Sequence, residues 1–460
     1  MYRERIREYF DVHFDEVLKS MKEIMLIDST FQNPKEGMPF GEGSAKALEW
    51  GAEFGRRLGM NVKNFDNYAI SMDFMEGEPK LGILSHLDVV PACDGWHYPP
   101  FDCTVDGENI YGRGAIDDKG PSVAVLYAIK CIKELGIPIR DNIRVIFGGN
   151  EEGGCEDIEY YETKEKFPPM VFTPDGTFPV LNCEKGMLHL SFSGNVDMKG
   201  SDGFEVRGIS AGTVVNAIPD KAECRCVGVT SDELEKAFLQ ADTECDIEIC
   251  DSDELSFVIK GRSAHGSRPE NGANAVTALL KILSLLGVEG ARMLSKLFPH
   301  GEYNGKSIGM GFSDSISGEM TCALTILGVN STMLNGGIDI RFPIDKKLDE
   351  ITKIITEALE NSGFSVDEAD GMEPHYVSED SPFVKALLEV YKDVKGEEGE
   401  CLAEGGITYV HNTDGGVAFG AEFPDEKNNM HGADEHISIE TMKYNLNMYA
   451  NAIIKICGGL

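Results

Sequence analysis

Apolar and polar residues alternate along the chain with two different periods, and these periods predict where helices and strands lie. Near the N-terminus, apolar residues from Ile6 to Ile24 recur at helical spacing, and residues 44–58 form a second amphipathic stretch. Short apolar runs predict buried strands at residues 68–75, 80–87, 142–149 and 170–173. Further helices are expected at residues 121–135 and 438–456. Strands that alternate with helices in this way predict an α/β fold with parallel neighbouring strands.

Three of the predicted strands end in residues that can bind a metal ion. The first carries His86 at its end, with Asp88 two positions later. Glu151 and Glu152 follow the second strand, and Asp175 follows the third. The carboxyl ends of parallel strands meet at one edge of the sheet, where such sheets bind ligands. We therefore expect these side chains to gather at that edge.

The candidate ligands are two imidazoles and three carboxylates: His86, Asp117, Glu152, Asp175 and His431. This set suits Zn²⁺ or Mn²⁺. Two such ions roughly 3.5 Å apart need one shared carboxylate, for which we expect Asp117, and a water that bridges them ionises near neutral pH. Glu151, next to a ligand, is placed to accept the proton of that water. Asp88 is expected to take the second N–H of His86 and so to fix the orientation of the ring.

Each of these motifs has a simpler explanation when it is taken alone. A histidine at the end of a strand is often satisfied by its own neighbour, and the pair Glu151-Glu152 is best explained by itself as an exposed acidic turn. Glycines on both sides of this pair, at the end of a buried strand, favour a functional turn instead. The metal hypothesis therefore depends on the combination of motifs.

Composition narrows the classes of function. The chain has 460 residues, of which 42% are apolar and 26% charged, enough for large cores and two domains or more. The formal net charge of -36 argues against nucleic-acid partners, which require a basic face. No stretch is long and apolar enough for a membrane span, and the 12 cysteines are scattered. These features predict a soluble cytoplasmic protein with reduced thiols that binds neither nucleic acid nor membranes.

The pattern changes after about residue 187, where strands and helices no longer alternate regularly. Strands are expected at residues 222–229, 255–260, 322–328 and 333–341. Helices are expected at residues 272–286 and 346–361. This α+β pattern predicts an inserted domain. The expected organisation is a first domain built from residues 1–186 and 373–460, and a second domain built from residues 187–372.

Several motifs are specific in combination. They are Ser85-His-Leu-Asp-Val-Val-Pro91, Gly112-Arg-Gly-Ala-Ile-Asp-Asp-Lys-Gly-Pro121, Gly149-Asn-Glu-Glu-Gly153, Thr173-Pro-Asp175 and the late His431. With them the chain resembles, over nearly its whole length, the di-zinc metallopeptidase family of carboxypeptidase G, aminoacylase, succinyl-diaminopimelate desuccinylase and carnosinase. Within this family it is most similar to the bacterial Xaa-His dipeptidase branch.

The resemblance implies a zinc-peptidase-like catalytic domain, in which helices flank a mixed, mostly parallel sheet, together with an inserted α+β lid domain. It implies the same five metal ligands as the residue chemistry, with Glu151 as the catalytic base and Asp88 as the residue that orients His86. Two divalent metal ions are implied, with zinc expected and manganese or cobalt as alternatives. A cis peptide bond after Asp117 is also implied.

Three residues of the middle segment are assigned a role only by this resemblance. The segment from Gly261 to Asn274 matches the lid segment of the family, in which His265 stabilises the oxyanion. Asn216 and Arg341 match positions that hold the terminal carboxylate of the substrate. In the dipeptidase branch an extended lid replaces the partner subunit of dimeric relatives, so we expect a monomer.

A glycine pair late in the chain matches a loop that lies close to the same carboxylate. Gly405 and Gly406 are therefore expected to contact the substrate. The loop departs from the family pattern, because Ile407 is an additional residue and His411 stands where arginine is expected. This departure leaves the preferred substrate open.

Taken together, these features favour a metallodipeptidase that hydrolyses unblocked dipeptides through a hydroxide bound to two metal ions. One alternative is hydrolysis of N-acyl amino acids by the same residues. Another is a non-catalytic, metal-dependent binding protein, which would be favoured if a ligand or Glu151 were missing. The sequence contains all of them.

Overall fold

The computed structural model of the chain describes residues 2–250, 255–330, 332–424 and 426–459. The chain divides into two compact units. Unit 1 consists of Met1–Asn182, Val377–Leu402 and Ile407–Leu460, and unit 2 consists of Cys183–Tyr376 and Ala403–Gly406. Each unit has its own hydrophobic core.

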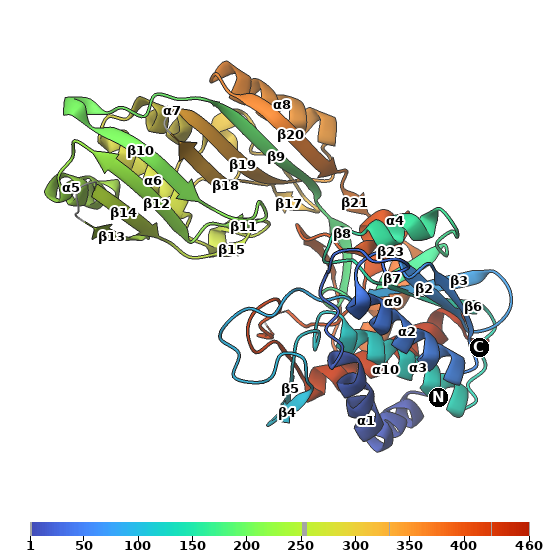
Figure 1. Cartoon of the computed structure of the whole chain (residues 1–460). Helices are drawn as coiled ribbons and strands as arrows, with labels where there is room; N and C mark the ends of the chain where they lie inside the picture. The colour runs from blue at the N-terminus through green and yellow to red at the C-terminus, as the bar shows by residue number, and fades with distance from the viewer. Residues whose placement is uncertain (1, 251–254, 331, 425, 460) are drawn as a thin grey trace. The chain divides into compact units, whose positions relative to one another are not determined.

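Unit 1 is built on a mixed sheet (Figure 1). Its strands lie in the order β1 (Asn61–Phe65), β2 (Ala69–Asp73), β6 (Asn142–Gly148), β3 (Pro79–His86), β7 (Met170–Thr173), β23 (Gly416–Ala418) and β8 (Val180–Glu184). The central strands β6, β3, β7 and β23 pair in parallel, whereas the pairs toward both edges are antiparallel. The parallel neighbours expected from the strand and helix pattern are thereby confirmed.

Helices cover both faces of this sheet. One core contains residues of α1 (Arg3–Met25), α2 (Glu42–Arg57), α3 (Lys119–Glu134), α9 (Pro382–Lys395) and α10 (Ile439–Cys457). From the sheet, Ile83 and Val145 join this core. Their neighbours Leu84 and Ile146 belong to a second cluster with α4 (Glu156–Glu162) and the short helix η4 (Tyr409–Asn412). Because successive strand residues point to opposite faces, the two clusters lie on opposite sides of the sheet.

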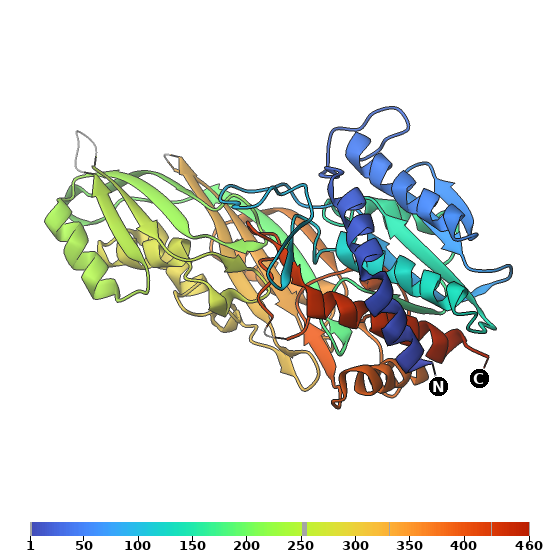
Figure 2. The same ribbon diagram turned by 90° about the horizontal axis from the view of Figure 1, so that it is seen from below.

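The two ends of the chain meet in unit 1. Helix α1 runs beside α10, and both terminal labels lie at the same end of the unit (Figure 2). A small sheet of β4 (Thr104–Asp106), β5 (Asn109–Tyr111) and β24 (His436–Ser438) precedes α10. The sequence pattern did not predict β4 and β5, because they lie in a segment rich in glycine, proline and aromatic residues.

Unit 2 contains an eight-stranded sheet in which all neighbours are antiparallel. The order is β13 (Asp246–Cys250), β14 (Leu255–Lys260), β12 (Lys221–Val227), β10 (Glu205–Ala211), β18 (Thr321–Asn330), β19 (Met333–Phe342), β9 (Gly186–Asn195) and β20 (Ser365–Met372). The helices are α5 (Ser231–Ala241), α6 (Ala275–Leu285), α7 (Glu289–Leu297) and α8 (Leu348–Asn361). Buried residues alternate with exposed ones along β12 and with half-buried ones along β9, as they do in a sheet with helices on one face only.

Shorter elements complete the chain. The two-stranded pairs are β11 (Ala217–Ile218) with β15 (Ala264–His265) and β16 (Ser313–Asp314) with β17 (Gly318–Glu319). Strands β21 (His375–Tyr376) and β22 (Cys401–Glu404) pair with β8. Short 3₁₀ helices are η1 (Ser201–Gly203), η2 (Pro269–Asn271) and η3 (Lys306–Ile308). The α/β architecture with an α+β insertion predicted from the sequence is confirmed.

Asn274 connects the first turn of α6 to the sheet of unit 2. Its side-chain oxygen accepts hydrogen bonds from the backbone N–H groups of Val276 and Thr277, and its amide nitrogen donates to the carbonyl of Leu324. The side chain is completely buried. Asn274 therefore caps the helix and also satisfies a buried strand carbonyl.

We expect Asn274→Ala to lower the free energy of unfolding by about 2–3 kcal/mol, because it removes an N-cap and leaves a buried carbonyl without a donor. The measurement is urea unfolding followed by circular dichroism. Thr230→Ala is the matched control, since Thr230 caps α5 at the surface and its side chain bonds Glu233 of the same helix. Thr230→Ala should lower the free energy of unfolding by only about 1 kcal/mol. Equal losses in the two variants would show that the bond to Leu324 contributes nothing.

Candidate metal centre

All six residues expected at the metal site lie together in unit 1. His86 is the last residue of β3, Glu151 and Glu152 follow β6, and Asp175 follows β7. The two remaining candidate ligands lie in loops: Asp117 precedes α3, and His431 precedes β24. The peptide bond after Asp117 is cis, as the family resemblance implied.

Asp117 lies between the two histidines. Its Oδ1 is 3.0 Å from Nε2 of His86, and its Oδ2 is 2.7 Å from Nε2 of His431. Nε2 of His431 also lies 3.0 Å from Oε1 of Glu152, and Nε2 of His86 lies 3.7 Å from Oδ2 of Asp175. One carboxylate thus offers a separate oxygen to each imidazole, which is the geometry of a ligand shared between two cations.

The ligand atoms form two groups, each with one imidazole and two carboxylates. The first group is His86, Glu151 and Asp175, and the second is Asp117, Glu152 and His431. Within each group the ligand atoms lie within 4.8 Å of one another. Imidazole nitrogens and carboxylate oxygens are the donors that Zn²⁺ and Mn²⁺ accept in proteins. The residues therefore fit two divalent cations, although the structure groups Glu151 with potential ligands.

Electrostatics gives a second reason why cations fit this site. Burial, and after it repulsion from neighbouring carboxylates, raise the pKa values of Glu151, Glu152 and Asp175. Burial opposes the charge of His431, but Asp117 and Glu152 raise its pKa to about 11. These directions mean that a bound proton is more favourable on these three carboxyl groups than on an ordinary exposed acid. A divalent cation in each group would replace those protons.

Asp88 holds two parts of the site in place. Nδ1 of His86 lies 3.1 Å from the backbone carbonyl of Asp88 and 3.4 Å from its Oδ1. The two carboxylate oxygens accept hydrogen bonds of 3.0 Å from the backbone N–H groups of Glu151 and Glu152. Asp88 therefore contacts the ring of His86 and also anchors the turn that carries the glutamates.

A second buried acid anchors the same turn and was missed by the sequence analysis. Oδ2 of Asp157 accepts hydrogen bonds from the backbone N–H groups of Gly149 and Asn150, at 2.6 and 2.7 Å, and from the hydroxyl of Tyr409. Burial, and then the charge of Asp88, raise the pKa of Asp157 to about 7. No local pattern distinguishes Asp157 from the other acids of this segment, because its partners are two backbone N–H groups and a hydroxyl 252 positions away.

The other expected site residues lie together in unit 2. His265 pairs with Ala217 between β15 and β11, and the N–H of Gly266 donates to the carbonyl of Asn216 at 2.7 Å. Nδ1 of His265 lies 2.7 Å from the hydroxyl of Ser267. The structure thus brings Asn216 beside His265.

Arg341 lies in β19 and is almost completely buried. Its guanidinium group donates to both oxygens of Asp339, at 3.0 and 2.8 Å, and to the carbonyl of Gly405 at 2.9 Å. Gly406 follows directly in the same loop. The loop comes close to the histidine segment, since a Cβ added at Gly405 would lie 2.8 Å from Cβ of Ser267.

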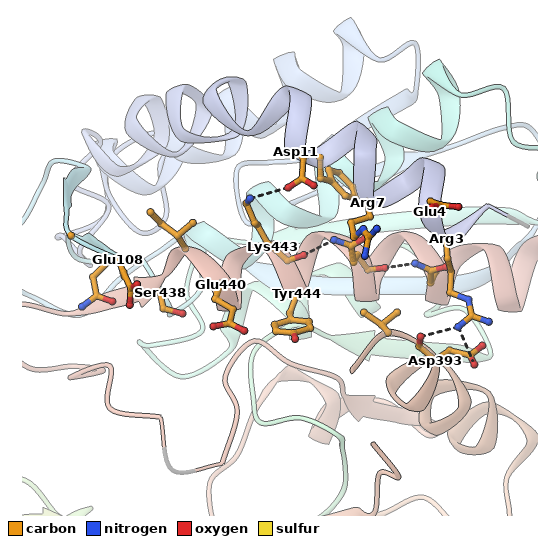
Figure 3. A pocket seen from close by; sticks show the side chains of 17 residues that line it. Arg3, Glu4, Arg7, Asp11, Glu108, Asp393, Ser438, Glu440, Lys443 and Tyr444 are labelled. Carbon is orange, nitrogen blue, oxygen red and sulfur yellow. Dashed lines mark hydrogen bonds and ion pairs between the residues drawn. The ribbon is translucent and has the colours of Figure 1, made fainter. Parts of the chain in front are cut away.

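A cavity of about 890 Å³ lies elsewhere in unit 1, between α1, α10, the end of α9 and the turn between β4 and β5 (Figure 3). Arg3 pairs with Asp393 at one end of it, and Lys443 pairs with Asp11. None of the candidate metal ligands is among the described residues that line it. This cavity is therefore not the metal centre.

Comparisons with known proteins agree with the motifs. Residues 82–455 match the model of a protein family that is described as Peptidase family M20/M25/M40. A relative from Bacillus subtilis (strain 168), named "Putative dipeptidase YtjP", is 32% identical over 455 residues, covering 96% of this chain and 97% of that protein. Within the described residues, no helix is both long and apolar enough to cross a membrane.

Two solved structures have the same fold. Human carnosine dipeptidase 1 has a TM-score of 0.61 at 17% identity, covering 99% of both chains. The dipeptidase Dug1p from Saccharomyces cerevisiae has a TM-score of 0.61 at 14% identity, covering 99% of this chain and 98% of that one. With its sequence matched to the family over most of its length, the chain belongs to peptidase family M20/M25/M40 and is a hydrolase of peptide bonds.

Proposed function

We propose that this peptidase is a metal-dependent dipeptidase. The observation that carries the proposal is the position of Asp117, with one oxygen at each histidine Nε2, beside the carboxylate of Glu151. The name of the Bacillus relative and the titles of the two dipeptidase structures support the choice of dipeptides as substrates.

Five side chains would hold two cations. His86 and Asp175 would bind one, Glu152 and His431 would bind the other, and Asp117 would be shared. Bound there, two divalent cations supply the positive charge that lowers the pKa of a water molecule and polarises the scissile carbonyl. Zinc is the expected metal, with manganese or cobalt as alternatives, because the donor set contains nitrogen and oxygen only.

Glu151 would move the proton. Its carboxylate accepts a proton from the attacking water and then delivers it to the nitrogen of the leaving amine. Burial raises the pKa of Glu151 above that of an exposed glutamate, and this carboxyl group would hold the proton between the two steps. Asp88 would support the transfer by fixing the backbone N–H of Glu151.

Unit 2, which contains the segment 187–372 expected from the sequence to be the lid domain, would act as the domain that recognises the substrate. His265 would donate a hydrogen bond to the oxyanion, and Asn216 would support it. Each of the three guanidinium nitrogens of Arg341 donates one N–H to Asp339 or Gly405. The second N–H of Nη1 has no hydrogen-bond partner among the described residues and would bind the substrate's carboxylate.

We also propose that the enzyme works as a monomer in the cytoplasm. The 12 cysteines are all free thiols, in agreement with a reducing compartment. Unit 2 carries its own histidine segment and its own arginine, so that a single chain contains every residue to which we assign a role. Hydrolysis of N-acyl amino acids would use the same residues and is the competing substrate class.

Removal of metal should abolish activity. We expect the purified protein to contain up to two divalent ions per chain and to lose dipeptidase activity in a chelator, because the attacking water depends on the cations. Elemental analysis and assays with Zn²⁺, Mn²⁺ or Co²⁺ added back separately provide the measurement. Full activity in protein shown to be free of metal would exclude the proposal.

Glu151→Gln should retain both ions while its turnover falls by about 10²–10⁴-fold, since it removes the general base. Glu152→Gln is the matched neighbour and should lose one ion. Metal content and kcat are measured on the same preparations. If Glu151→Gln loses an ion instead, Glu151 is a ligand, as its grouping with His86 and Asp175 allows.

Amidation of the C-terminus of a good dipeptide should weaken binding by about 1.5–3 kcal/mol, the typical contribution of a hydrogen bond to a charged group. The Michaelis constants of a dipeptide and its amide are compared in the wild type and in Arg341→Lys, which keeps the charge but loses the planar fork. The difference should shrink in the variant. Equal rates on the dipeptide and its amide would show that Arg341 has another role and would count against the dipeptidase proposal. Faster hydrolysis of N-acyl amino acids would point to the competing substrate class.

A further inference from the structure

A buried ion pair joins the two loops that carry Asp117 and His431. Nη1 of Arg113 lies 2.5 Å from Oε2 of Glu435, and the side chains are only 1% and 0% exposed. Arg113 stands four residues before Asp117, and Glu435 stands four residues after His431. The pair therefore connects segments that are far apart in the sequence.

Glu435 holds the backbone of the first loop. Its Oε1 accepts hydrogen bonds from the N–H groups of Gly114, Ile116 and Asp117, at 2.9, 3.2 and 3.4 Å. Its own carbonyl accepts a hydrogen bond of 2.9 Å from the N–H of Gly112. One glutamate thus determines the path of the chain directly up to the shared ligand.

Arg113 holds the backbone of the second loop. Its Nη2 donates to the carbonyl of His431 at 3.2 Å and to the carbonyl of Pro91 at 3.3 Å. The guanidinium group also lies over the ring of Trp96, 5.3 Å from its centre. The position of His431 is therefore tied through Arg113 to the same glutamate that holds Asp117.

Stability alone does not account for this pair. A buried ion pair generally adds little over apolar residues of the same volume, because both charges lose their hydration. What apolar residues cannot provide is a set of directed bonds to the backbone of both loops. These bonds fix the distance between the Asp117 and His431 side chains, which are 2.7 Å apart at Oδ2 and Nε2.

We propose that Arg113 and Glu435 are positioning residues for the cation that Asp117, Glu152 and His431 would bind. The inference rests on the proposed metal centre and adds a role for two residues that touch neither cation nor substrate. Groups that support metal ligands from behind typically change metal affinity by about 10–100-fold when they are replaced.

The test is a titration of metal-free protein with Co²⁺, followed by visible absorption, with the number of bound ions checked by elemental analysis. For Glu435→Gln we expect one ion to bind about 10–100-fold more weakly, while the other keeps an affinity near that of the wild type. Arg113→Lys is the second variant, because lysine keeps the charge beside Glu435 but cannot also reach the carbonyls of Pro91 and His431. If circular dichroism shows that Glu435→Gln is unfolded, the Co²⁺ titration of Arg113→Lys tests the proposal instead.

A matched control exists in the same unit. Arg144 in β6 forms a similar buried pair with Asp73 in β2, with Nε and Nη2 at 2.8 and 2.9 Å from the two carboxylate oxygens. Its partners among the described residues include no candidate ligand. Asp73→Asn should lower the melting temperature and leave both Co²⁺ affinities unchanged.

The outcomes separate the two proposals. Wild-type protein that binds no cation contradicts the metal centre itself. Wild-type protein that binds two ions, with both affinities unchanged in Glu435→Gln and Arg113→Lys, overturns only the positioning role. Equal loss of metal in Asp73→Asn would also overturn it, since the effect would then follow stability and not position.

Discussion

The crowding of carboxylates around Asp117 is the constraint on which the rest of unit 1 depends. Four acidic side chains and two imidazoles share a largely buried site, and their repulsion can be relieved only by protons or by cations. A polypeptide can maintain such a site only if the surrounding structure holds each group firmly. The fold provides this support mainly through backbone N–H groups.

Three further buried acids have this supporting role, and their partners differ from those of the ligands. Asp88, Asp157 and Glu435 each accept two or three backbone N–H bonds. These N–H donors stabilise a negative charge on each of the three carboxylates. Glu151 and Asp175 have no comparable set of donors among the described contacts, so their compensation must come from the centre of the site. The distribution of amide donors therefore separates the acids that support the site from Glu151 and Asp175, which face its centre.

Unit 2 uses a related arrangement around a single acid. Asp339 is completely buried and accepts both hydrogen bonds from Arg341, while His189 approaches the same carboxylate at 2.9 Å. Burial by itself would raise the pKa of Asp339, but His189 and Arg341 outweigh this effect and lower the pKa to about 2. Gly266 packs directly on this carboxylate, since an added Cβ would lie 2.8 Å from its Cγ. A glycine beside His265 is thus required by the close approach of Asp339.

The sequence by itself predicted most of the elements of the catalytic sheet and the set of candidate ligands. The pattern of apolar residues predicted the bounds of β3, β6, β7 and α10 to within two residues. The acids and histidines at the ends of the predicted strands indicated which side chains come together. These inferences succeed because strand direction and side-chain chemistry are local properties. The motifs together also predicted the family, which the comparisons confirm.

Only the tertiary structure decided which residues hold the site in place. The supporting roles of Asp157, Tyr409, Arg113 and Glu435 cannot be recognised in the sequence, although Arg113 lies within one of its motifs. Their partners are backbone groups and side chains up to 322 positions away. The same holds for Ala403–Gly406, which belong to unit 2 although the surrounding chain belongs to unit 1. A hydrogen bond to a backbone group depends on where the chain runs in space and not on the identity of the residue that carries the group. A sequence can therefore name the ligands of such a centre, whereas their support becomes visible only once the chain has folded.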